Sequence, residues 1–405
     1  MKFKKRNNNG KRKKNKHYLN PKKFVKRYIE KGIKKHEIIL GKTTKPIKTA
    51  KIILLLILTF IYIFFSKYIA VHFLSNQKRV GVINVGNYQN VGTALVKYSM
   101  FKKLEEFGCN VTIIAPKRNH QVNIDFLIRT IKSNLLMVEN FNELKESDFD
   151  YIFLSSDQVW GYFDKKYFFD VAFLKFAENW TIPKFIYAAS FGRDKWFYNK
   201  YEEKIAKKLL KNFTGISFRE KGLVKLAKEH LGIESEFVLD PTLLINTKYY
   251  LKEIKHYKSE FSPDDKFIFV YQLNEDKILE NVIKESSKKF NYKINKHQLK
   301  NNDYIESFIF GISNCRAVIT DSFHGTIFSI RFNKPFIAFM NVEVGKGRFD
   351  SLKEAFNIGN RIIYPSDRDK IDINLLLQPP NVNEKLFYEL QTYSIDYLKK
   401  HLGLL

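Results

Sequence analysis

The sequence predicts an α/β protein with two successive series of strands and helices, preceded by a basic tail and an apolar segment. From residue 79 onward, short apolar runs of the strand type alternate with longer helical runs, which is typical of parallel sheets covered by helices. A charged stretch, 247–265, interrupts this alternation and carries Pro263, so we interpret it as the connection between two domains. The 405 residues suffice for two or three domains, and a 44% hydrophobic fraction is ample for folded cores.

The basic charge of the chain is concentrated at its N-terminus. Residues 1–51 contain 20 of the 70 lysines and arginines and only two acidic residues, so they carry +18 of the net charge of +28. Such a polar, low-complexity stretch has too few apolar residues for a core, and residues 1–51 are predicted to be a disordered tail. Nucleic-acid binding is disfavoured, because no recognition fold accompanies the charge.

An apolar segment, residues 52–74, follows the tail. It reaches the ~20 residues of a spanning helix if Lys67 extends toward the membrane surface. We therefore expect a transmembrane or membrane-anchoring helix, with an interfacial anchor as the alternative. The positive charge before the segment predicts a single-pass protein with a cytosolic N-terminus and a lumenal or extracytoplasmic C-terminal part. Anchoring of that part to the cytosolic face is the other possibility.

The first series, residues 79–250, is predicted to form the N-terminal domain. Its first strand leads through the glycine- and asparagine-rich loop 86–92 into a helix. Asn90 and Gly92 lie where unpaired N–H groups of that helix suit a phosphate or a sugar, although ordinary turn formation explains the same residues. Polar residues, among them Asp157, also follow the later strands, and this recurrence predicts one shared cleft at the carboxyl ends.

The second series, residues 265–375, is predicted to form the C-terminal domain, and residues 376–405 a final helix. A polar loop, TDSFHGT at 320–326, joins an apolar strand to a helical run from Ile327, where α/β proteins bind ligands. His324 in this loop can move a proton near neutral pH. The other loop residues expected to contact a bound anion are Asp321, Ser322, Gly325 and Thr326. The alternative is that Asp321 and Ser322 only cap the helix while His324 hydrogen-bonds the backbone.

Six blocks, in this order, together resemble the polysaccharide pyruvyl transferase family: NVGNYQNVGTALVKYSMFKKLEEFG, SSDQVWG, YAASFG, ISFREKG, VLDPTLLI and ITDSFHGTIFSIRFNKPFI. The resemblance covers residues 80–360. It implies two Rossmann-like domains in a glycosyltransferase-B-like arrangement, with the donor phosphoenolpyruvate in the cleft between them. The acceptor it implies is a sugar of a polysaccharide or glycan. Ser155 and Gly161 depart from the family's usual residues, which leaves the choice of acceptor open.

The resemblance also implies two catalytic residues, because the family's essential histidine falls on His324 and the arginine of its S-x-R block on Arg219. A guanidinium can hold a carboxylate or phosphate in a bidentate pair, and ketal formation requires a group that gives and takes protons. No cofactor is expected besides the donor substrate, and Cys109 and Cys315 do not have the spacing of a metal site. A nucleotide-sugar-dependent glycosyltransferase and a non-catalytic, membrane-anchored glycan-binding protein are the alternatives. The sequence does not determine the oligomeric state.

Overall fold

The computed structural model describes residue 59 and residues 77–85, 90–117, 124–131, 134–161, 166–297, 304–340 and 345–405. The chain divides into two compact units, Met1–Asn76 and Gln77–Leu405, and both sheets belong to the second. The predicted tail and, apart from Thr59, the predicted membrane segment lie outside the described residues. Within the described ranges, no helix is long and apolar enough to cross a membrane.

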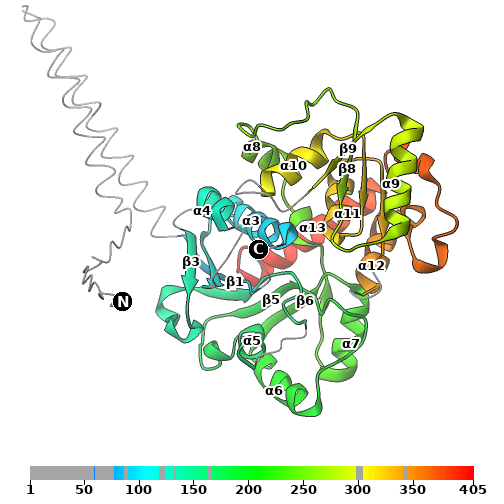
Figure 1. The fold of residues 1–405 in the computed structure, drawn as a ribbon. Coiled ribbons are helices and arrows are strands. Elements are labelled where there is room, and N and C mark those ends of the chain that lie inside the picture. Colours follow the sequence, from blue (N-terminus) through cyan, green and yellow to red (C-terminus); the bar gives the residue numbers. More distant parts are fainter. Residues whose placement is uncertain are drawn as a thin grey trace, which may run out of the picture. The chain divides into compact units, whose positions relative to one another are not determined.

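A seven-stranded parallel sheet forms the N-terminal part of the second unit (Figure 1). Its strand order is β3-β2-β1-β4-β5-β6-β7, which contains the order typical of Rossmann folds. The chain adds strands on one side of β1 up to β3 and then on the other side from β4 onward, so the topological switch point lies between β1 and β4. The strands are β1 (Arg79–Ile83), β2 (Asn110–Pro116), β3 (Leu135–Val138), β4 (Tyr151–Leu154), β5 (Lys184–Ala189), β6 (Phe213–Phe218) and β7 (Glu236–Phe237). Every residue of β5 is buried, as expected for a parallel strand covered on both faces.

A five-stranded parallel sheet forms the C-terminal part, with the order β12-β11-β10-β8-β9. Counted from β8, this is the flavodoxin-like order, the other common doubly wound arrangement. Its topological switch point lies between β8 and β10. The strands are β8 (Phe267–Tyr271), β9 (Lys293–Lys296), β10 (Ala317–Thr320), β11 (Phe336–Phe339) and β12 (Ile362–Ile363). The prediction of an α/β protein with two parallel sheets is therefore confirmed.

The helices connect successive strands and cover the sheets (Figure 1). In the first part they are α3 (Val91–Glu106), α4 (Ile124–Ile131), α5 (Lys166–Ala172), α6 (Lys200–Leu210), α7 (Lys221–Leu231) and α8 (Thr247–Glu253). In the second part they are α9 (Lys277–Phe290), α10 (Tyr304–Asn314), α11 (Phe323–Arg331), α12 (Gly347–Phe356) and α13 (Glu384–His401).

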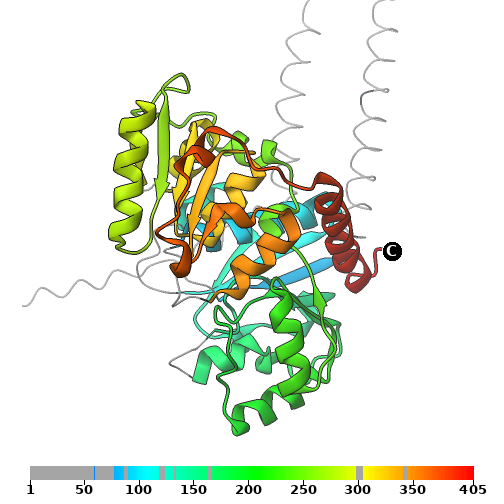
Figure 2. The ribbon, with the colours of Figure 1, turned by 90° about the vertical axis from the view of Figure 1, so that its right-hand side faces the viewer.

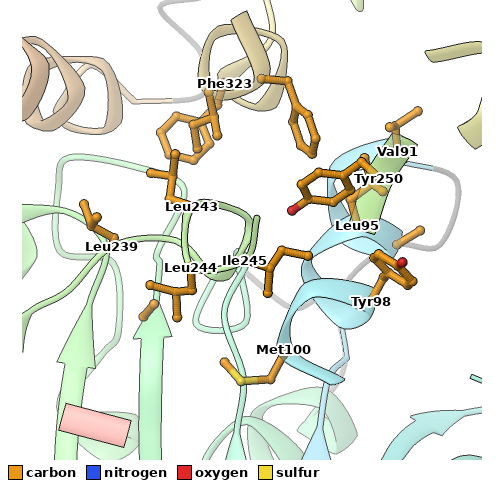
Figure 3. Packing of buried hydrophobic residues seen from close by; sticks show 14 of the residues in the cluster. Val91, Leu95, Tyr98, Met100, Leu239, Leu243, Leu244, Ile245, Tyr250 and Phe323 are labelled. Carbon is orange, nitrogen blue, oxygen red and sulfur yellow. The ribbon is translucent and has the colours of Figure 1, made fainter. Parts of the chain in front are cut away.

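Helix α3 lies where the two sheets are joined, and most of its side chains are buried. Figure 3 shows Leu95 and Tyr98 of α3 beside Tyr250 of α8. The Tyr250 hydroxyl donates to the Thr242 carbonyl at 2.9 Å, and its ring packs edge-on against Phe328 of α11 with centroids 5.0 Å apart. One hydrophobic cluster therefore runs from the N-terminal sheet to the C-terminal sheet and fixes the two relative to each other.

Helix α13 crosses back to the N-terminal sheet, as Figure 2 shows in red. The Ser394 hydroxyl accepts from the Leu239 amide at 2.9 Å, and the Tyr397 hydroxyl donates to the carbonyl of Ile186 in β5 at 3.0 Å. At the other end of α13, Phe387 packs on Phe356 of α12. The last helix thus contacts both parts of the second unit.

Three local expectations differ from the structure. The final helix, expected over residues 376–405, is α13 and spans Glu384–His401. The stretch 247–265, expected to be only a connection, contains α8 and is anchored by Tyr250 in the core. The helix expected from Ile327 begins at Phe323, because the Ser322 hydroxyl accepts the Gly325 amide at 3.3 Å as an N-cap. His324 therefore lies in the first turn of α11 rather than in the preceding loop.

Candidate active site

Polar residues from three strand ends converge on one buried cluster. Asp157 follows β4, Arg219 directly follows β6, and Asp240 follows β7. The carboxyl ends of parallel strands meet at the same edge of a sheet, which brings these side chains together below His324 of α11. We term Asp157, Arg219, Asp240 and His324 the central cluster.

Arg219 is held at both ends of its guanidinium group. Its Nη1 donates to Asp240 Oδ2 at 2.7 Å, and its Nη2 donates to Asp157 Oδ1 at 3.2 Å. Its Nε lies 3.7 Å from Glu220 Oε1, and the Phe323 ring covers one face with its centroid 4.7 Å from Cζ. The side chain is only 1% exposed, so carboxylates of the protein itself, rather than solvent, neutralise Arg219.

His324 is placed by packing. Its Nε2 lies 3.7 Å from Asp240 Oδ2, which is longer than a hydrogen bond, and this atom has no hydrogen-bond partner among the residues that the structure describes. A Cβ added at Gly92 would lie 1.9 Å from Nδ1 of the same ring. The first turn of α3 therefore requires a glycine at position 92 so that the imidazole can lie against it.

Both aspartates of the central cluster are held as anions. Burial alone would raise the pKa of Asp157, but Arg219, His324 and a hydrogen bond from the Thr93 hydroxyl outweigh it, and the pKa is lowered. At Asp240 burial is again outweighed, and His324 and Arg219 hold the pKa of that carboxyl well below its usual range. Asp157 also has a φ of 96°, a strained value for a non-glycine residue that costs on the order of 1–3 kcal/mol.

The other loop residues predicted to bind an anion instead have structural partners. Both oxygens of Asp321 accept hydrogen bonds from Leu273 and Asn274 after β8, at 2.7 to 3.0 Å. The Thr326 hydroxyl donates to the Ser322 carbonyl, and a Cβ at Gly325 would lie 2.3 Å from Thr320 Oγ1. These contacts hold the first turn of α11 in place, and Asn90 likewise caps α3 by accepting from the Gly92 amide at 2.7 Å.

A cavity of about 260 Å³ adjoins the central cluster and is lined by both domains. Three cationic side chains line it, those of Arg193, Lys346 and Arg348. Three carboxyl side chains also line it, those of Asp194, Glu220 and Asp350. Burial and repulsion by Arg219 lower the pKa of Arg348 to about 10, so this guanidinium stays charged at neutral pH. The Arg348 Cζ lies 5.5 Å from the centroid of the Phe323 ring, and the Arg219 Cζ lies 4.7 Å from the same centroid. The Phe323 ring thus contacts both Arg348, which lines the cavity, and Arg219 of the central cluster.

Sequence reasoning missed several residues of this site. Glu220 stands inside the ISFREKG block, so a signal for it was present beside Arg219. Asp240 stands in VLDPTLLI, but an aspartate before proline is also an ordinary helix cap, and Asp240 does accept from the Thr242 amide at 3.0 Å. Lys346 and Arg348 belong to no recognisable motif, because only the packing of the two domains brings them to the cavity.

The sequence matches the model of a known family. A family model of polysaccharide pyruvyl transferases matches residues 5–341, which is most of the chain. The chain belongs to the polysaccharide pyruvyl transferase family. The family membership predicted from the six sequence blocks is thus confirmed. The central cluster and the cavity therefore belong to a transferase. A search of curated protein sequences finds no match.

Solved structures with a similar fold include enzymes of sugar nucleotides. The S. aureus protein MnaA in a co-structure with UDP is 16% identical, with 81% of this chain and 98% of that chain covered and a TM-score of 0.48. UDP-GlcNAc 2-epimerase from Neisseria meningitidis, bound to UDP-GlcNAc, is 11% identical, with 80% and 93% covered and a TM-score of 0.45. Arabidopsis thaliana UGT89C1 complexed with UDP-L-rhamnose is 9% identical, with 81% and 98% covered and a TM-score of 0.48.

Within the described residues, no group of three or more histidine, cysteine, aspartate and glutamate side chains is arranged to hold a metal ion. Cys109 and Cys315 are both buried, and burial raises the pKa of Cys315 to about 12, so its thiol stays protonated. The central cluster itself consists of two carboxylates, one guanidinium and one imidazole.

Proposed function

We propose that this chain transfers the pyruvyl group of phosphoenolpyruvate to a sugar of a polysaccharide or glycan, forming a pyruvate ketal. The observation that carries the proposal is the position of His324 in a chain of this family. Its Nε2 is buried, has no hydrogen-bond partner among the described residues, and lies 3.7 Å from Asp240, a carboxylate that stays ionised.

This geometry suits proton transfer from an acceptor hydroxyl. A neutral imidazole can take the proton as the hydroxyl oxygen attacks, and the negative charge of Asp240 then stabilises the imidazolium. Arg219 keeps Asp240 and Asp157 in place, because its two Nη groups donate to one carboxylate each. Arg219 is accordingly expected to act chiefly by fixing the charged frame around His324.

The donor has a carboxylate and a phosphate, and three of the side chains that line the cavity beside the central cluster are cations suited to these groups. The volume of the cavity is slightly below that of typical small-molecule pockets, which is about 300–1,000 Å³. Arg193 comes from the N-terminal domain, and Lys346 and Arg348 come from the C-terminal domain. We propose that these side chains hold the donor, so that binding needs both domains.

Calorimetric titration of the full-length protein with phosphoenolpyruvate tests this proposal, together with phosphate release in the presence of galactose- or mannose-type acceptors. Arg348→Gln is expected to weaken donor binding by about 1.5–3 kcal/mol, the range for a hydrogen bond to a charged group. Arg368→Gln is the control, because Arg368 pairs with Asp276 and does not line the cavity. Binding of a UDP-sugar without binding of phosphoenolpyruvate would contradict pyruvyl transfer and support a nucleotide-sugar-dependent enzyme.

We also propose that residues 52–74 attach the enzyme to a membrane, with the folded unit Gln77–Leu405 on the lumenal or extracytoplasmic side. The support is the apolar character of the segment and the basic tail before it. Protection of the folded unit from protease in sealed membranes is the expected result, and its digestion would place it on the cytosolic face.

A further inference from the structure

One carboxyl group beside the cavity differs from the others in its contacts. Glu220 occupies the N-cap position of α7, yet its side chain makes no capping hydrogen bond. The residue is 3% exposed and lines the cavity. Its Oε1 accepts from the Ser190 hydroxyl at 2.6 Å, whereas its Oε2 has no hydrogen-bond partner among the described residues.

Among the described residues, Glu220 has no cationic partner within hydrogen-bond distance. Its nearest ionic contact is Arg219 Nε at 3.7 Å from Oε1, while the Nη groups of Arg219 bind Asp240 and Asp157 at 2.7 and 3.2 Å. The guanidinium thus neutralises the two aspartates by direct hydrogen bonds and Glu220 only at a longer distance. A buried carboxylate with only one long ion pair is costly, which favours the protonated form of Glu220.

The groups that face Glu220 do not reverse this preference. Burial raises the pKa of Glu220, and Asp194 raises it further, while Arg219, the Ser190 hydroxyl and Arg348 lower it; the balance is a raised pKa. Asp157 and Asp240 are shifted in the opposite direction. Neighbouring carboxyl groups whose pKa values are pushed apart in this way are suited to separate acid and base roles.

We propose that Glu220 is the acid that protonates the methylene carbon of phosphoenolpyruvate. This role rests on the proposed function. The O–H bond of the Glu220 carboxyl breaks, and the electron pair of the donor's carbon–carbon double bond forms the new C–H bond. The neighbouring carbon, which bears the phosphate and the carboxylate, becomes electrophilic and bonds to the oxygen of an acceptor hydroxyl. The proton of that hydroxyl passes to His324.

The second half of the reaction leaves the charges balanced. The bond between carbon and the phosphate oxygen breaks with its electron pair, and a second acceptor hydroxyl bonds to the same carbon and completes the ketal. The proton of this hydroxyl passes to the departing phosphate, while His324 returns its proton to solvent and Glu220 regains one. No oxidant or reductant takes part. A neutral Glu220 also avoids repulsion between its side chain and the anionic donor.

The deciding experiment measures proton uptake when the full-length protein binds phosphoenolpyruvate. Titrations in two buffers of different ionisation enthalpy, at a series of pH values from mildly acidic to alkaline, give the number of protons bound with the donor. The wild-type protein is expected to take up a proton, or to lose donor affinity, as the pH rises through the titration of Glu220. Glu220→Gln keeps the size and neutrality of the protonated side chain, so it is expected to bind the donor without this dependence.

Glu203→Gln is the matched control. Glu203 of α6 is also buried, but it accepts from Lys200 of the same helix and from Trp196, and it does not line the cavity. It should keep the wild-type proton uptake. If Glu220→Gln does not fold, Glu220→Asp retains an acid and should retain the uptake. Identical profiles for the wild type and Glu220→Gln would overturn the role of Glu220.

Turnover adds a second readout. With an acceptor that the wild type uses, Glu220→Gln is expected to release phosphate about 10²–10⁴-fold more slowly, the usual range for a lost proton donor. An unchanged rate would overturn the acid role. If the wild-type protein binds no phosphoenolpyruvate, the proposed function itself fails. If the wild type binds the donor and Glu220→Gln matches it in proton uptake and turnover, the proposed function stands and only the role of Glu220 fails.

Discussion

The two sides of the central cluster differ in how their polar atoms are held. On the side of the N-terminal domain, Arg219 is hydrogen-bonded to Asp157 and Asp240, and all three groups stay charged. On the side of the C-terminal domain, His324 is held by contact with Gly92, and its Nε2 makes no hydrogen bond within the described residues. The difference indicates a fixed charged frame on one side and a group able to exchange a proton on the other.

Replacing His324, the group able to exchange a proton, should have the largest effect on activity. His324→Gln fills much of the ring's volume but cannot take a proton, so phosphate release should fall about 10²–10⁴-fold while donor affinity and the thermal midpoint stay close to wild type. His297→Gln is the control, because His297 is buried against Tyr304 with ring centroids 4.3 Å apart and lies outside the central cluster. It should lose stability and keep activity. The reverse pattern would remove His324 from catalysis.

Breaking the frame should chiefly affect stability. Arg219→Leu leaves Asp157 and Asp240 buried without their cation, so the free energy of unfolding in urea should fall by about 3–5 kcal/mol. Lys221→Leu is the matched control, because the adjacent Lys221 pairs with Glu354 at the surface and should cost about 0–1 kcal/mol. Similar losses for the two variants would show that the Arg219 pairs are no stronger than a surface pair.

The contact between the two sides can be tested at a single glycine. Gly92→Ala places a Cβ 1.9 Å from Nδ1 of His324, so the ring or α3 must move, at a cost of about 1–3 kcal/mol in stability. At Gly222 in α7 an added Cβ meets no atom within 4 Å, so Gly222→Ala should be neutral or stabilising by up to about 1 kcal/mol. Thermal unfolding of both variants measures the difference. Equal midpoints would contradict the proposed contact.

The smallest effect is a difference in pH dependence between two carboxyl groups. The folded-state pKa of Asp240 is lowered, so its contribution to stability is present above the unfolded value of about 3.9 and is lost as the pH falls below it. The pKa of Glu220 is raised, so its contribution is present below about 4.3 and is lost as the pH rises through the folded value.

Urea unfolding across pH measures these two contributions. The stability deficit of Asp240→Asn should shrink in acid. Relative to wild type, Glu220→Gln should become more stable as the pH rises, by about 1.4 kcal/mol for each unit by which the pKa is raised. If the stability of the two variants relative to wild type changed with pH in the same way, the pKa values of the two carboxyl groups would not be shifted in opposite directions.

Most of the strand and helix pattern was predictable because it depends on neighbours in the chain. Buried parallel strands such as β5 are short apolar runs, and α3 follows a polar loop with a capping asparagine. The prediction was less accurate where a distant contact decides the local structure. Helix α8, for example, forms inside a charged stretch because Tyr250 enters the core. The start of α11, four residues earlier than expected, has a local cause instead, because Ser322 caps the helix.

The sequence by itself identified the family, the two parallel sheets, and His324 and Arg219 as residues of interest. It did not determine how these side chains are held, since the partners of Arg219 come from the ends of β4 and β7 and those of His324 from α3. Only the tertiary structure decided that Arg219 forms close ion pairs with two aspartates, whereas the carboxyl of the adjacent Glu220 lies farther from the guanidinium. The physical reason is that the charge state of a buried group depends on every dipole and charge around it, and these groups are far apart in the chain.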